Sequence, residues 1–287
     1  MKLRGRLQVS FHGEEGVDAG GLTREWYLTL SKEIFNPNYA LFSPVDSATF
    51  QPNPLSFINS NHLDYFKFVG RIIGKAISDG HLMDAHFTRC NLNIAVDLLK
   101  FSRSFYKHVL GAPVDYNDLE ALEPEYYNSL KAILEVPIEA LGLELTFSAE
   151  TQTFGKVEII DLVSNGRNIP VTDENKFDYV QLVAQHRMTT GIKSQIDAFL
   201  RGFYELVPAE LISIFSPTEL ELLICGLPDV DIDELRINTE YHQYRATDTC
   251  IQWFWEVLKG FSREDRALFL LFVTGTSKVR YANVNVA

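Results

Sequence analysis

Apolar residues recur at helical spacing through most of the chain, and glycine, proline or a capping residue marks the ends of each run. Gly20-Gly21 precedes an apolar stripe that continues from Leu22 to Phe35, and Pro37 cannot extend that helix. Asn61 is a capping residue for a second stripe that continues to Gly80. These two runs predict amphipathic core helices.

The middle of the chain carries a different pattern. An acidic helix is predicted at about residues 126–134, and three short β-prone segments follow at 143–147, 157–161 and 169–172. Turn signals such as Ser164-Asn165-Gly166 separate these segments. The pattern predicts a small β-sheet beside the acidic helix.

The remainder of the sequence is again helical. A long helix is predicted from about 173 to 203, interrupted at most by Gly191. The residues Ser216 to Glu219 form a capping box that opens a helix ending at Gly226, and two further helices are expected at 248–260 and 262–272. The whole pattern predicts an α+β fold that is mostly helical with small β-sheets. The best candidate for a linker is Gly226-Leu227-Pro228, because glycine closes a helix and proline cannot continue it.

Composition narrows the class of protein. The 287 residues are 46% apolar and 22% charged, which is typical of a folded globular chain, and no apolar run is long enough to span a bilayer. The three cysteines are widely spaced, which favours a reducing compartment, so we expect the protein in the cytoplasm or nucleus and not at a membrane.

The negative charge is concentrated in one segment. Residues 113–174 hold 13 acidic and three basic side chains, a net charge of −10 out of −12 for the whole chain. Such a surface repels nucleic acid and would attract a basic protein partner. The alternative is a merely solvated face, because charge runs usually serve solubility.

Several motifs resemble sites of chemistry in part, and none of them predicts a metal, a cofactor or a catalytic set. The glycine-rich segment 13–21 lacks the Lys-Ser/Thr pair of a phosphate loop, and residues 229–240 hold Glu234 where a calcium loop needs glycine, so helix-start acids explain them better. His81, His86 and Cys90 are too few for a convincing zinc site. Cys225 and Cys250 lie in apolar helical sequence, which favours packing over nucleophilic chemistry.

Six stretches in order along the chain resemble one family. They are residues 14–27 (EEGVDAGGLTREWY), 35–42 (FNPNYALF), 62–71 (HLDYFKFVGR), 219–226 (ELELLICG), 251–255 (IQWFW) and 272–279 (FVTGTSKV). Together they resemble the HECT-type E3 ubiquitin ligases, most closely the very large Mule/Tom type. The resemblance covers most of the chain.

The resemblance implies a bilobal HECT-like domain. Residues 1–225 would form the N-lobe, with an E2-binding small subdomain at about 113–183. Gly226, Leu227 and Pro228 would form the hinge, and 229–287 would be an incomplete C-lobe. It implies that ubiquitin-conjugating enzyme (E2) and ubiquitin are the partners, and that the parent protein transfers ubiquitin through a cysteine thioester to a substrate lysine. Carried over by position, the E2-binding residues would be Tyr126, Leu130, Ile133, Leu143, Leu145, Tyr179 and Val183.

The chemistry of these seven residues suits an apolar groove. Tyr126, Leu130 and Ile133 share one helix face, and Leu143 and Leu145 alternate along a predicted strand. Spacing alone favours the alternative that these side chains belong to the core. The family resemblance favours the groove.

The sequence departs from the family in three places, the first being that the family's opening helix, expected ahead of Leu3, is missing. The family's His-Thr-Cys-Phe strand does not occur, so the catalytic cysteine is expected beyond the end of this chain, which would be inactive alone. Residues 90–103 look like an insertion between segments that are continuous in the family. The alternative to a ligase fragment is a non-catalytic E2-binding or scaffolding module, or the product of a defective gene.

Overall fold

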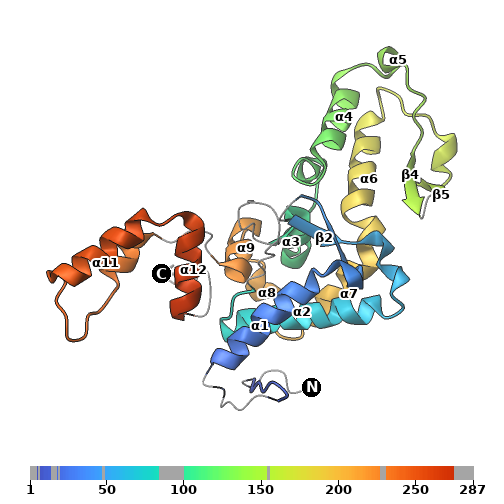
Figure 1. Ribbon diagram of the computed structural model, residues 1–287. Helices are drawn as coiled ribbons and strands as arrows, with labels where there is room; N and C mark the ends of the chain where they lie inside the picture. The colour runs from blue at the N-terminus through green and yellow to red at the C-terminus, as the bar shows by residue number, and fades with distance from the viewer. Residues whose placement is uncertain are drawn as a thin grey trace. The chain divides into compact units, whose positions relative to one another are not determined.

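Helices dominate the fold (Figure 1). The computed structural model describes residues 5, 7–13, 18, 20–46, 49–83, 100–153, 156–226 and 231–274. Within these ranges the α-helices are α1 (Gly21–Ile34), α2 (His62–Asp79), α3 (Arg103–Leu110), α4 (Pro124–Glu135), α5 (Ile138–Leu141), α6 (Lys176–Met188), α7 (Lys193–Phe203), α8 (Ala209–Ile212), α9 (Pro217–Cys225), α10 (Ile232–Ile237), α11 (Thr249–Gly260) and α12 (Arg263–Thr274).

The strands are short. They are β1 (Phe42–Pro44), β2 (Thr49–Pro52), β3 (Lys100–Phe101), β4 (Ser148–Thr153) and β5 (Lys156–Asp161). The 3₁₀ turns are η1 (Pro37–Tyr39), η2 (Pro54–Ile58), η3 (Tyr116–Leu119), η4 (Gly166–Asn168) and η5 (Thr190–Ile192). A mostly helical chain with small sheets confirms the predicted α+β class. None of the helices in the described ranges combines the length and apolar composition that crossing a lipid bilayer requires.

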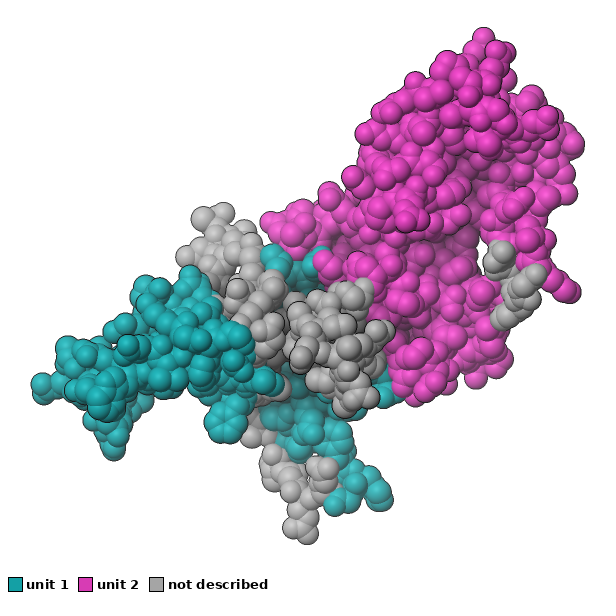
Figure 2. Space-filling view, turned by 45° about the horizontal axis from the view of Figure 1, so that its top comes forward, with its two compact units in different colours: residues 1–33, 75–99, 221–287 teal, residues 34–74, 100–220 magenta. Residues whose placement is uncertain are grey.

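The chain divides into two compact units that are interleaved in sequence. Unit 1 holds residues 1–33, 75–99 and 221–287, and unit 2 holds residues 34–74 and 100–220, as Figure 2 shows in teal and magenta. Because the units do not follow the order of the sequence, the lobe boundaries expected at residues 225 and 229 stay a prediction.

Unit 2 depends on an unusually close approach of two helices. A Cβ atom built on Gly70 of α2 would lie 2.1 Å from the carbonyl oxygen of Phe199, and one on Gly202 of α7 would lie 2.0 Å from the carbonyl oxygen of Lys67. Both distances are shorter than any real carbon–oxygen contact, so each position accepts only a residue without a side chain. The two backbones therefore touch at both glycines.

A three-stranded sheet with an aromatic core packs in the same unit. β1 pairs antiparallel with β2, and β2 pairs parallel with β3, which aligns Phe50 with Phe101. Phe101 is buried, and its ring lies 4.8 Å from that of Phe105 and 5.2 Å from that of Phe35. Ser102 then caps α3 by accepting a hydrogen bond from the backbone N–H of Phe105.

These contacts bear on the insertion expected at residues 90–103. Its last four residues, 100–103, form β3, the cap and the first residue of α3 and are part of the fold. The rest of the segment lies outside the described residues. The sequence pattern did not predict the β1–β2–β3 sheet, because each of its strands is too short to show alternation.

The acidic segment forms a small subdomain within unit 2. Helices α4 and α6 lie side by side, next to the β4–β5 hairpin (Figure 1). β4 pairs antiparallel with β5 from Ser148↔Asp161 to Thr153↔Lys156. The predicted strands at 143–147 and 169–172 instead meet at one isolated bridge, Thr146↔Pro170. A small sheet beside α4 was thus correctly predicted, with β4 as a strand that the pattern had missed.

The C-terminal helices have a core of their own within unit 1. Ile232, Trp255, Leu258 and Leu270 are buried together, and the indole N–H of Trp255 donates a hydrogen bond of 2.8 Å to the hydroxyl of Tyr241. Asp231 caps α10 through the backbone N–H groups of residues 233 and 234, as the helix-start acids predicted.

Several predicted helix ends are confirmed. The capping box at α9 is present, since the backbone N–H of Ser216 donates to the carboxylate of Glu219 and the N–H of Glu219 donates to the hydroxyl of Ser216. Gly226 follows α9 in the left-handed conformation with φ of 76°. The predicted long helix breaks at Gly191 into α6 and α7. Leu227 and Pro228 of the predicted hinge lie outside the described residues.

The glycine-rich segment before α1 has a structural role in the described residues. The carboxylate of Asp18 accepts hydrogen bonds from the backbone N–H groups of Val9, Gly20 and Thr23 and from the Thr23 hydroxyl. The Thr23 hydroxyl, together with these N–H groups, holds the pKa of Asp18 well below its usual range. The residue therefore stays ionised and caps the first turn of the helix.

We predict that Gly202→Ala destabilises unit 2 by about 3 kcal/mol, because the new methyl group would overlap the Lys67 carbonyl oxygen and force α2 and α7 apart. Alanine favours a helix over glycine by only about 1 kcal/mol, which the overlap outweighs. Urea unfolding followed by circular dichroism measures the difference. Gly260→Ala in α11 is the control, since no described atom outside the adjoining backbone of its own helix lies within 4 Å of the added carbon. Equal unfolding midpoints for the two variants would contradict the prediction.

Candidate functional site

The predicted E2-binding residues all lie in the small subdomain, but at very different depths. Leu130 and Ile133 of α4 and Tyr179 and Val183 of α6 are buried, with exposed fractions between 1% and 7%. They pack in one hydrophobic cluster with residues such as Leu119 and Met188. In this structure these four side chains therefore lie in the hydrophobic core, as in the alternative interpretation of the sequence.

The other three predicted residues reach the surface to some extent. Tyr126 and Leu145 are half-buried and pack against the same cluster, and Leu143 is 50% exposed. Leu143 and Leu145 precede the isolated bridge instead of lying in a regular strand, so their exposure does not follow a strand's alternation. The accessible part of the predicted groove therefore consists of Tyr126, Leu143 and Leu145.

Tyr126 is held in place by Arg187 of α6. The guanidinium carbon of Arg187 lies 3.9 Å from the centre of the Tyr126 ring, a cation–π contact. The same guanidinium donates hydrogen bonds of 2.9 and 2.7 Å to the two carboxylate oxygens of Glu123. This chain of contacts ties α4 to the C-terminal end of α6 and fixes the ring of Tyr126.

An aromatic row beside α4 was missed by the sequence analysis. The ring of Tyr116 stacks on that of Tyr127 at 6.0 Å and contacts the ring of Phe177 edge-on at 6.5 Å. Phe177 is 55% exposed although it lies only two residues from the buried Tyr179. α6 carries apolar residues on more than one face, so spacing could not separate its exposed phenylalanine from its core residues.

The surface around these residues carries unbalanced negative charge. Six of the 13 acidic residues in 113–174 have ion-pair partners, among them Asp118 with Lys107 at 2.5 Å and Asp161 with Arg167 at 3.0 Å. The other seven are exposed and make no ion pair with any described residue. They are Glu120, Glu125, Glu139, Glu144, Glu150, Glu158 and Glu174. The small subdomain thus presents apolar and aromatic side chains on an acidic background, which suits a partner with basic and apolar residues.

The other candidate sites gain no support from their surroundings. Across the described ranges, His, Cys, Asp and Glu side chains nowhere gather in a group of three or more that would hold a metal ion. His81 stacks on Tyr27 at 4.9 Å, whereas His86 and Cys90 lie outside the described residues. Cys225 is buried in α9, and Cys250 is exposed in the first turn of α11.

Comparisons with known proteins give the chain its relatives. Residues 28–281 match the HECT-domain (ubiquitin-transferase) family. Over 280 residues the chain is 54% identical to the E3 ubiquitin-protein ligase HUWE1 of Mus musculus, covering 97% of this chain and 6% of the mouse protein. It is 53% identical over 285 residues to UPL1 of Arabidopsis thaliana, covering 96% of this chain and 7% of that ligase. It is 49% identical over 276 residues to TOM1 of Saccharomyces cerevisiae, covering 96% of this chain and 8% of that ligase.

The matches cover almost all of this chain but only a small part of each relative. The chain spans only 6–8% of the length of these three ligases. The similarity to HUWE1 and TOM1 agrees with the resemblance to the Mule/Tom type that the sequence motifs indicated.

We predict that the burial of Tyr179 makes unit 2 sensitive to alkali. Burial, with a contribution from the charge of Tyr126, raises the pKa of Tyr179 from 10.0 to about 12. The folded chain then keeps a proton that the unfolded chain loses. This stabilisation is complete below pH 10 and falls by about 2 kcal/mol as the pH rises to 12.

Tyr179→Phe should remove this part of the pH dependence. Urea unfolding between pH 8 and pH 12 should show a loss of stability that is about 2 kcal/mol smaller in the variant than in the unmodified chain. Tyr244→Phe, which changes a 56% exposed ring, is the control. Identical pH profiles for Tyr179→Phe and the unmodified chain would disprove the assignment.

Proposed function

The chain belongs to the HECT-domain family of ubiquitin transferases, and on that premise we propose that it is the E2-binding part of a large E3 ubiquitin-protein ligase. The whole protein would accept ubiquitin from the E2 on a cysteine and pass it to a substrate lysine. The observation that carries the proposal is the family match over residues 28–281 together with an acidic small subdomain whose apolar residues reach the surface.

We propose that the E2 contacts the surface formed by Tyr126, Leu143 and Leu145. Leu143 offers an exposed aliphatic contact, and Tyr126 offers a ring that Arg187 and the packing of α4 hold in place. A rigid aromatic side chain loses little conformational entropy on binding, which makes it a suitable anchor. The buried residues Leu130, Ile133, Tyr179 and Val183 would support this surface from beneath.

The unpaired carboxylates of the small subdomain would act mainly on the rate of encounter. Exposed charges attract a basic partner over about a Debye length, 8–10 Å at physiological salt, and add little to the affinity of the final complex. The proposed E2 surface therefore combines a small apolar contact with long-range attraction. Its binding should weaken as salt is added.

Ubiquitin transfer to a cysteine needs a thiolate that attacks the carbonyl carbon of the E2 thioester while the E2 thiolate leaves. The sequence has no His-Thr-Cys-Phe strand, and its cysteines are Cys90, Cys225 and Cys250. Cys225 is buried and inaccessible to another protein. We therefore propose that this chain binds charged E2 without accepting ubiquitin, which is also how the alternative E2-binding module would behave.

The expected compartment follows from the same thiols. Cys250 is exposed and forms no disulfide with any described residue. An exposed thiol of this kind is suited to a reducing environment. We propose the cytoplasm or the nucleus as the place where the protein acts.

We predict that Leu143→Asp weakens binding of an E2 at least tenfold, because it places a charge in the apolar contact and adds to the negative surface. Leu143 is 50% exposed, so the variant should remain folded. Calorimetric titration with a panel of E2 enzymes measures the affinity. Leu211→Asp is the matched control, since Leu211 is 62% exposed and belongs to α8. Equal affinities for the two variants would exclude Leu143 from the interface.

We predict that the chain, mixed with ubiquitin-charged E2, forms no ubiquitin adduct that a reducing agent cleaves. Buried Cys225 cannot reach the E2 thioester, and no other cysteine lies in the family's catalytic sequence. Non-reducing electrophoresis of the reaction tests this. A thiol-sensitive adduct that disappears with Cys250→Ser or Cys90→Ser would show that the chain itself accepts ubiquitin.

A further inference from the structure

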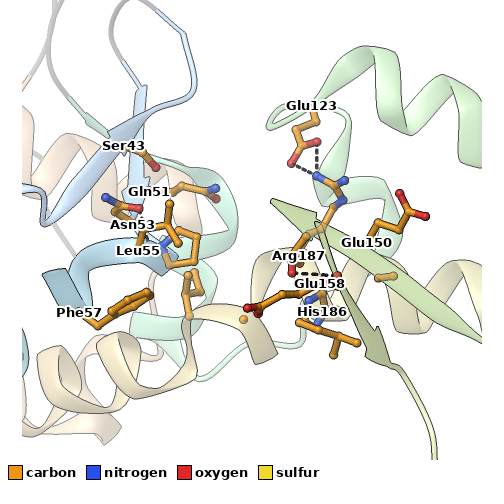
Figure 3. A pocket seen from close by; sticks show the side chains of 16 residues that line it. Ser43, Gln51, Asn53, Leu55, Phe57, Glu123, Glu150, Glu158, His186 and Arg187 are labelled. Atoms are coloured by element: carbon orange, nitrogen blue, oxygen red, sulfur yellow. Dashed lines mark hydrogen bonds and ion pairs between the residues drawn. The ribbon is translucent and has the colours of Figure 1, made fainter. Parts of the chain in front are cut away.

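The side chain of Glu123 turns away from its own helix and toward Arg187. Glu123 occupies the N-cap position of α4, where a side-chain oxygen can accept hydrogen bonds from the first turn, yet it makes no capping bond. Both of its carboxylate oxygens instead accept hydrogen bonds from Nη1 of Arg187, at 2.9 and 2.7 Å, as Figure 3 shows. The ion pair therefore joins the start of α4 to the last turn of α6.

This ion pair adds little to the stability of unit 2. The side chains of Glu123 and Arg187 are each 34% exposed, and ion pairs that reach solvent contribute little to folding because water screens them. Buried apolar residues such as Leu130 and Val183 hold α4 and α6 together. The effect of the pair is therefore expected at the surface and not in the core.

Arg187 restricts the ring of Tyr126. Its guanidinium carbon lies 3.9 Å from the ring centre, and the two bonds to Glu123 hold the guanidinium there. A planar guanidinium stacks on an aromatic ring, which the ammonium group of lysine cannot do. A surface that is ordered before its partner arrives loses less entropy on binding. Arg187 therefore acts on a partner through Tyr126, as a positioning residue.

Glu123 balances the charge that Arg187 would otherwise add beside Tyr126. His186, the neighbour of Arg187, is neutral at pH 7, because burial, with the nearby charge of Arg187, lowers its pKa. The exposed Glu125 on α4 is negative and makes no ion pair with any described residue. Without the carboxylate of Glu123, an unbalanced cation would stand beside the ring and repel a basic partner.

We propose that Arg187 is a positioning residue and Glu123 a specificity-determining residue of the E2 surface. Arg187 holds the Tyr126 ring in the orientation that the E2 contacts. Glu123 keeps the guanidinium balanced, so that the surface selects an E2 whose contact surface is basic. These roles rest on the proposed function. Orientation acts on the formed complex and so on the dissociation rate, whereas charge acts on the approach and so on the association rate.

Glu123→Gln tests the role of charge. Stopped-flow kinetics with the 287-residue chain and a basic E2 should show association about two to three times slower than for the unmodified chain. The difference should disappear at about 1 M salt, where the Debye length is about 3 Å. With an E2 whose contact surface is acidic, the variant should associate faster than the unmodified chain.

The matched control for this variant is Asp197→Asn. It removes the same charge from an exposed ion pair with Lys193 on α7. Equal slowing in Glu123→Gln and Asp197→Asn would reduce the effect to net charge and overturn the role of Glu123. Equal effects on the basic and the acidic E2 would overturn it as well.

Arg187→Lys tests orientation without changing the charge. It should leave association unchanged and speed dissociation about threefold to tenfold, because the ammonium group cannot stack on the ring. The NMR signals of the Tyr126 ring, assigned by their loss in Tyr126→Phe, should also shift in this variant without any E2. Arg167→Lys, in the exposed pair with Asp161, is the matched control and should change neither. Unchanged ring signals, or an unchanged dissociation rate, would overturn the role of Arg187.

The result for Leu143→Asp separates these roles from the proposed function. If Leu143→Asp leaves E2 binding unchanged, the proposed surface is wrong and the roles of Glu123 and Arg187 fall with it. If Leu143→Asp weakens binding while Glu123→Gln and Arg187→Lys keep the rates of the unmodified chain, the surface stands and only the roles of the pair are overturned.

Discussion

The contact between the backbones of α2 and α7 at Gly70 and Gly202 sets the position of everything else in unit 2. Each glycine leaves room for a carbonyl oxygen of the opposite helix, so the helices cannot slide or turn without a clash. Side-chain pairs at the edges reinforce the contact, as where Arg71 donates hydrogen bonds of 2.7 and 2.8 Å to Glu205. The exposed pair contributes little by itself, so the geometry comes from the glycines and from the packing around them.

The position of α7 also fixes the position of the small subdomain. α7 follows η5 directly, and η5 follows α6, which carries Tyr179, Val183 and Arg187. His108 of α3 bonds through Nε2 to the carbonyl oxygen of Met188 at 3.0 Å, so the end of α6 is also tied to the helical part of the unit. This end of α6 also carries Arg187, whose guanidinium lies over the ring of Tyr126 in the proposed E2 surface. The tie to α3 therefore also holds the side chain that positions Tyr126.

The sequence predicted the parts of the fold that depend on local pattern. Long runs with clear ends, such as α2 between Asn61 and Gly80, needed only periodicity and capping chemistry. The β1–β2–β3 sheet was not predictable, because β3 has two residues and pairs with β2 across about 50 residues of chain. The spacing of apolar residues also could not predict how deeply each side chain is buried. Tyr126 and Leu130 lie on one face of α4, yet one is half-buried and the other fully buried, because only the packing of α6 against α4 decides between them.

The depths of these residues bear on how a binding surface of this kind evolves and is tested. If Leu130, Ile133, Tyr179 and Val183 form the floor and Tyr126, Leu143 and Leu145 form the contact, then a change to a floor residue acts on binding through folding. Removing a buried leucine costs about 2–5 kcal/mol, which is a large fraction of the stability of a small domain. Loss of binding in such a variant therefore says nothing about contact. The exposed Leu143 can report on contact alone, since charge added there leaves the cluster of α4 and α6 intact.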